Sequence, residues 1–121
     1  MQEISAKIIN RKIISANIFI SQNLSKKIEL NMESRAKIKT PKNEENNTLL
    51  LNLELNINSK DEELRIKLVS DIIFELDKLP DDYNEIAEQK LVPMAREMLL
   101  NSLDEMLVVM GYQKMELVQK I

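Results

Sequence analysis

Alternation of apolar and polar residues over three long stretches is the feature that most constrains this chain. In residues 48–58, every odd-numbered position from Leu49 to Ile57 is apolar, and the positions between them are Asn or Glu except Leu50. Residues 27–39 and 63–77 follow the same pattern. Because successive side chains of a β-strand point to opposite faces, each stretch predicts a strand with one buried face.

The connections between these stretches predict an antiparallel sheet. Residues 40–47 and 58–63 are polar and contain turn formers, and residues 21–25 form a weaker connector. Short connections join antiparallel neighbours, so we expect a four-stranded meander whose apolar face needs a cover. Within the first strand, the Ile13-Ile14 doublet predicts a bulge or register change between an Ile4–Ala6–Ile8 row and an Ile14–Ala16–Ile18–Ile20 row. The expected strands span about 4–20, 27–39, 48–58 and 63–77.

After residue 80 the apolar spacing changes to three and four, which is typical of a helix. Asp81 or Asp82 can cap the start of that helix. Pro93 lacks an N–H and crowds the preceding turn, so it either kinks one helix or lies in the first turn of a second. Gly111 stands where a helix ends in a left-handed residue, and a short extended tail is expected beyond it.

The expected helices span about 82–92 and 94–110, the longer one with Pro93 at its start. Together with the strands they predict an α+β fold in one domain, residues 1–121, with the helices packed on one face of the sheet.

The composition excludes many kinds of catalytic site. The chain has no Cys and no His, which removes disulfides, thiolate ligands and the commonest general base and metal ligand. Its single Gly excludes the usual phosphate-binding loops. Acidic clusters at 44–45, 61–63 and 81–82 lie in predicted turns or at a helix start, where solvated carboxylates are the norm, although such groups can hold a cation. We expect no enzyme activity, no cofactor and no metal site.

The sequence also bears on location and partners. No apolar run reaches the roughly 18 residues of a membrane span, and the absence of Cys suits a reducing compartment, so a cytoplasmic protein is expected. Residues 1–42 carry nine basic against three acidic residues, while residues 43–121 carry eight against seventeen. Basic strands lying beside acidic ones would explain this asymmetry. With so few aromatic residues and net negative charge, a nucleic-acid partner is not expected.

More apolar residues are present than the inner rows and one helical stripe can use. Several lie on the polar side of the strands or off the main stripe of the long helix, and five of the seven methionines lie between Met94 and Met115. Methionine suits surfaces that accept varied shapes, although at helical spacing it is more often core. These residues either pack against loops or form a subunit interface or binding groove. The candidates for client or subunit binding are Phe19, Leu50, Val69, Ile73, Met94, Met98, Leu100 and Val109.

Residues 91–97, Leu-Val-Pro-Met-Ala-Arg-Glu, carry a resemblance to a known family. They resemble the start of the long helix in SecB-type protein-export chaperones, where an apolar pair precedes Pro-x-Ala-Arg-Glu. Gly111, followed by Met115 and Leu117, is similar to the end of that helix and the apolar stretch after it. The resemblance implies four antiparallel strands followed by two helices, and dimers or tetramers built through edge strands and helices.

The resemblance further implies binding of unfolded polypeptide in grooves between sheet and helix. The expected function is therefore a non-enzymatic, SecB-like protein that holds non-native chains or one dedicated protein partner. The alternative is a structural or regulatory homo-oligomer of the same fold without chaperone activity.

Overall fold

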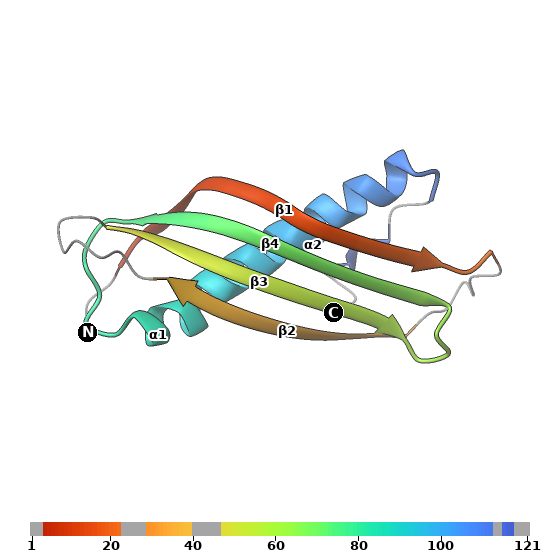
Figure 1. Ribbon diagram of the computed structural model, residues 1–121, viewed down its shortest axis with the longest axis horizontal. Coiled ribbons are helices and arrows are strands. Elements are labelled where there is room, and N and C mark those ends of the chain that lie inside the picture. The colour runs from red at the N-terminus through yellow and green to blue at the C-terminus, as the bar shows by residue number, and fades with distance from the viewer. Residues whose placement is uncertain (1–3, 23–28, 40–46, 113–114, 118–121) are drawn as a thin grey trace.

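The computed structural model describes residues 4–22, 29–39, 47–112 and 115–117. One antiparallel sheet of four strands is covered on one face by a helical run that crosses it diagonally (Figure 1). We call this covered face the inner face and the opposite one the outer face. The elements are β1 (Ala6–Ile20), β2 (Leu30–Lys39), β3 (Thr48–Ser59), β4 (Leu64–Leu76), α1 (Tyr83–Ile86), the π-helical turn η1 (Ala87–Leu91) and α2 (Val92–Val109).

The strand order, β1-β4-β3-β2, corrects the predicted meander. Strands β2, β3 and β4 do follow one another as a meander, but β1 pairs with β4 rather than with β2, as in a Greek key. Alternation determines which face a strand buries, but it does not determine which strand pairs with which. The nine residues between Ile20 and Leu30 can span about 30 Å, well beyond the roughly 14 Å across three strand spacings, so chain length permits this order.

Strand β1 has two register shifts, one between Ile8 and Asn10 and one between Ile13 and Ser15. The second confirms the irregularity predicted at the Ile13-Ile14 doublet. It is Ile13, however, that lies opposite the buried Ser70, whereas Ile14, expected in the inner row, is the extra residue and is 52% exposed. The first shift was not predicted. Because of it, Arg11 rather than Asn10 shares the inner face with its partner Ile72.

Charges are distributed over the sheet as the asymmetry of the sequence predicts. Lys7 Nζ of β1 lies 3.9 Å from Glu75 Oε1 of β4, and Arg35 of β2 is paired with Glu54 of β3 in the strand register. Glu54 Oε1 also lies 3.2 Å from Lys67 Nζ. Basic edge strands therefore lie beside acidic side chains of the central strands.

The helical run begins at an N-cap, as predicted: Asp82 Oδ1 accepts the backbone N–H groups of Asn84 and Glu85, at 3.0 and 3.2 Å. Pro93 lies in the first turn of α2, but the two predicted helices are joined without a break. The π-helical turn explains the continuity. The Val92 N–H donates to the carbonyl of Ala87, five residues back, and this wider turn precedes the position where proline supplies no donor.

A Schellman motif ends α2. Gly111, with a φ of 103°, donates to the carbonyl of Val108, and Tyr112 donates to that of Leu107. This confirms the expected role of the glycine. Residues 115–117 pack against the core, where Met115 and Leu117 are buried. The tail expected here to be extended is not extended in this part, because Glu116 has a φ of 54° and Leu117 is helical.

The core lies between the inner face of the sheet and α2. The inner rows of β3 and β4 are almost completely buried, and α2 contributes Ala95, Leu99, Leu100, Leu103 and Leu107. Each fully buried Leu stabilises the fold by roughly 1.5–3 kcal/mol. Among the described residues, no helix combines the length and the apolar composition needed to cross a bilayer.

Candidate functional site

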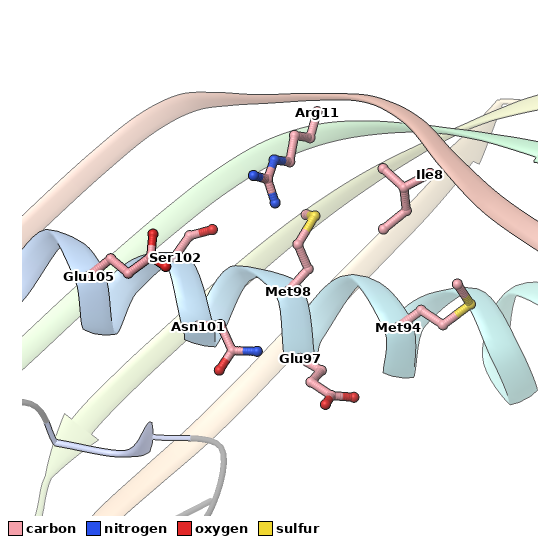
Figure 2. A pocket seen from close by; sticks show the side chains of 8 residues that line it. All are labelled: Ile8, Arg11, Met94, Glu97, Met98, Asn101, Ser102 and Glu105. Carbon is pink, nitrogen blue, oxygen red and sulfur yellow. The ribbon is translucent and has the colours of Figure 1, made fainter.

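Helix α2 covers the middle of the sheet and leaves a groove at each edge strand. The first groove, which we call the methionine groove, has a volume of about 400 Å³ and runs between β1 and α2. Met94 and Met98 lie one turn apart on α2, and both are half-buried. Met98 points toward Arg11 and Ile8 of β1, and the Met94 side chain extends along the helix (Figure 2). The lining residues are Ile8, Arg11, Met94, Glu97, Met98, Asn101, Ser102 and Glu105.

The bulge in β1 shapes this groove. An extra residue bends a strand and turns the side chains after it, and here it directs Arg11 toward Met98 (Figure 2). A guanidinium group on the strand side therefore faces the Met98 thioether, while Glu97 and Glu105 are the acidic lining residues on the helix side. The groove combines an apolar centre with charged borders, which is the arrangement of sites that bind apolar segments in a fixed orientation.

The second groove, which we call the β2 groove, has a volume of about 690 Å³ and lies between β2 and the start of the helical run. On this side the sheet ends at β2, and no described strand pairs with its far edge. The Lys60 N–H donates to the Glu29 carbonyl at 3.3 Å, so an odd-numbered residue just before β2 directs its backbone toward β3. Because bonding alternates along an antiparallel strand, the even-numbered residues of β2 direct their backbone groups away from β3. The groove is lined by Ser34, Ala36, Lys37, Ile38, Asn84, Ala87, Glu88 and Val92.

The structure divides the binding residues predicted from the sequence into four groups. Met94 and Met98 line the methionine groove. Leu50, Val69 and Ile73 lie half-buried on the outer face, where Leu50 and Ile73 are cross-strand partners.

Phe19 also lies on the outer face, 49% exposed, with the Arg65 guanidinium 5.0 Å from its ring centroid. Val109, at the end of α2, is 87% exposed. Leu100 is only 3% exposed and belongs to the core, so this chain does not offer it as a surface contact.

Other lining residues were not predicted. In the sequence, nothing distinguishes these residues from ordinary inner-row residues. They line the grooves because they lie on the edge strands: Ile8 on β1, and Ala36 and Ile38 on β2. The Ile8-Ile9 doublet was the available signal for the first bulge, in the same way as Ile13-Ile14 for the second.

Asp104 is a buried carboxylate in the middle of the apolar face of α2. Asp104 is only 2% exposed, and its Oδ2 accepts the Leu117 N–H at 3.0 Å. Within the described part of the chain, its Oδ1 has no hydrogen-bond partner. A buried carboxylate is costly unless it is hydrogen-bonded, so this single bond is a strong constraint on where residues 115–117 lie. Across the described ranges, no three His, Cys, Asp or Glu side chains are grouped in a way that could hold a metal ion.

An antiparallel sheet in the order β1-β4-β3-β2, covered on one face by a single long helical run, is the SecB-like fold. A solved structure with this fold is the SecB-like chaperone Rv1957 of Mycobacterium tuberculosis, in complex with a ChAD peptide from the Rv1956 HigA1 antitoxin. The two structures match with a TM-score of 0.70 over 91% of this chain and 87% of that one, at 6% sequence identity. No family model matches this sequence, and no curated protein is significantly similar to it.

Proposed function

We propose that this protein is a non-enzymatic polypeptide-binding protein that holds segments of non-native chains, or of one dedicated protein partner, in the grooves beside α2. The observation that carries the proposal is the methionine groove, where Met94 and Met98 stand half-exposed over Ile8 between charged borders. Flexible thioethers adapt to side chains of different shapes, which a binder of varied segments needs. The similar SecB-like chaperone structure, which was solved with an antitoxin peptide bound, supports the same activity.

The β2 groove adds a second mode of binding to this proposal. An extended segment can pair with the backbone groups of β2 that no described strand engages, while its alternate side chains enter the groove. Backbone pairing is independent of sequence, so it suits a protein that binds unfolded chains. A cytoplasmic setting, where such chains emerge, is part of the proposal.

The test is suppression of aggregation of a chemically unfolded model protein, followed by light scattering. Met98→Glu should abolish most of the suppression, because it places a carboxylate on the apolar side of the methionine groove. Met110→Glu is the matched control, since Met110 is 52% exposed and is not among the residues lining the groove. Equal activity of the wild type and Met98→Glu would refute this role of the groove.

A second candidate function is a structural or regulatory homo-oligomer, dimer or tetramer, without client binding. It is favoured by apolar side chains of β1, which is an edge strand among the described strands and in which Ile9, Ile13 and Ile14 are 46%, 38% and 52% exposed. Exposed neighbouring isoleucines on the edge strand of a sheet are typical of an interface. An oligomer that leaves aggregation of the model protein unchanged would favour this candidate over the first.

A further inference from the structure

Phe19 borders a hollow on the outer face, on the side of the sheet away from the two grooves. The hollow, which we call the Phe19 pocket, has a volume of about 400 Å³ and lies over β1, β4 and β3. Its first row runs across the sheet from Phe19 to Arg65 to Asn58, because Arg65 is the register partner of both others. The next row of the sheet completes the polar lining with Asn17, Lys67 and Asn56.

An aromatic ring and a guanidinium group stand together in this pocket. The Arg65 guanidinium lies 5.0 Å from the centroid of the Phe19 ring, and about half of Phe19 is exposed. A guanidinium group that stacks on a ring keeps its N–H donors, and their rigid fork can donate two parallel hydrogen bonds to a carboxylate. The exposed ring offers an apolar contact to a side chain next to that carboxylate.

The charge of Arg65 is not compensated by its neighbours on the sheet. Elsewhere on the outer face, Glu54 Oε1 lies 3.2 Å from Lys67 Nζ, and Glu75 Oε1 lies 3.9 Å from Lys7 Nζ. Arg65 has neutral register partners on both sides, and none of the residues lining the pocket is acidic. Among the described residues, no carboxylate forms an ion pair with it. A chain with net charge −3 therefore presents a positive, partly apolar pocket here.

Three asparagines indicate that the complementary ligand is a polypeptide. Asn17, Asn56 and Asn58 line the pocket, and within the described part of the chain their side chains make no hydrogen bond. Each side-chain amide offers both a donor and an acceptor, which are the two groups that a peptide unit requires. A simple anion would use only the donors.

We propose that the Phe19 pocket binds an acidic segment of a protein partner. A carboxylate of the segment accepts hydrogen bonds from Arg65, an adjacent apolar side chain packs on Phe19, and the asparagine amides bond to the backbone of the segment. The pocket lies on the face opposite α2, so the inference goes beyond the proposed function and does not rest on the grooves.

The test uses the full-length protein and a fluorescein-labelled peptide in which one Leu stands between two Glu residues, measured by fluorescence anisotropy. Arg65→Gln should weaken binding by about five- to tenfold, the loss of a charge-assisted hydrogen bond that is partly exposed to water. This loss should shrink at high salt. Phe19→Ser should weaken binding severalfold, because the Leu loses its apolar contact.

A matched control is available on the same face. Arg35→Gln makes the same exchange on β2, opposite Glu54 and outside the pocket lining, and should leave the affinity unaltered. A peptide with Gln in place of both Glu residues should bind the wild type and Arg65→Gln equally weakly. If Arg65→Gln does not fold, Asn58→Asp replaces it, because a carboxylate beside Arg65 should compete with that of the peptide and weaken binding.

Three results would overturn the inference. The first is equal affinity of the wild type and a folded Arg65→Gln variant. The second is a loss of affinity in Met98→Glu but not in Arg65→Gln, which would place the peptide in the methionine groove and support only the proposed function. The third is a thymidine oligonucleotide that binds as tightly as the peptide and depends equally on Arg65. Binding that depends on Arg65, without suppression of aggregation, would refute the proposed function alone.

Discussion

Arg11 on β1 and Met98 on α2 face each other across the methionine groove (Figure 2). The guanidinium group is thereby positioned to attract carboxylates of a chain bound over the thioether. We expect Arg11→Glu to weaken binding of an apolar peptide with acidic flanks by about two- to fivefold, the size of effect for a partly solvated charge. Anisotropy titrations at low and high salt measure this, and the effect should shrink as salt screens it.

Lys12 supplies the matched control for that experiment. It is the next residue in the chain, but its partner Asp71 places it on the outer face. Lys12→Glu makes the same change in net charge and should leave peptide affinity unaltered. An equal loss in both variants would show that net charge, and not the position of Arg11 in the groove, determines affinity.

Gly111 is expected to be sensitive to substitution through its backbone alone. Its φ of 103° disfavours residues with a Cβ, although nothing lies within 4 Å of the place where that Cβ would stand. Gly111→Ala should therefore lower the free energy of unfolding by about 1–2 kcal/mol, the cost of a left-handed conformation. Urea denaturation measures it. Gly111→Asn, which tolerates positive φ better, should cost less; the reverse order would exclude a backbone origin.

Much of the fold could be predicted because side-chain period is a local property. Alternation from Leu49 to Ile57 identified the buried row of β3, and the glycine identified the end of α2. The strand that pairs with β1 could not be found in the same way. Both β2 and β4 have an alternating apolar row, so the pattern does not distinguish between them. The helical run continues across Pro93 because of a π-helical turn, which the apolar spacing of the sequence does not predict.

The candidate site was predicted only in part, for a related reason. Residues off the inner rows were expected to pack against loops or to form a subunit interface or binding groove. Leu50 and Ile73 lie on the outer face, while Met94 and Met98 lie in a groove. A pattern shows that a residue is not in the main core and does not show where the surface is open. That depends on strand order, which leaves β1 and β2 at the edges beyond the cover of α2.

Asp104 should contribute to stability through residues 115–117. Asp104→Ala removes the acceptor of the Leu117 N–H and leaves that buried donor unpaired. We expect a loss of about 1–3 kcal/mol in the free energy of unfolding, measured by urea denaturation. Glu105→Ala, an adjacent and exposed position, should change stability by less than about 0.5 kcal/mol. A neutral or stabilising Asp104→Ala would show that the cost of burying the carboxylate outweighs its hydrogen bond.

Ile14 tests whether the edge of β1 is a subunit interface. Ile14 is the extra residue of the second bulge, 52% exposed beside Ile13. If two copies meet there, Ile14→Lys introduces one lysine per protomer, and symmetry doubles the effect. We expect the dissociation constant of the oligomer to rise by at least about tenfold, since an unpaired charge at an apolar interface is costly.

Size-exclusion chromatography with light scattering over a range of protein concentrations measures this change. Leu79→Lys is the control, because Leu79 is 43% exposed and lies in the connection between β4 and α1, not in β1. The control should keep the wild-type mass. A wild-type chain that runs as a monomer at every concentration, or an Ile14→Lys variant with unchanged mass, would exclude the β1 interface.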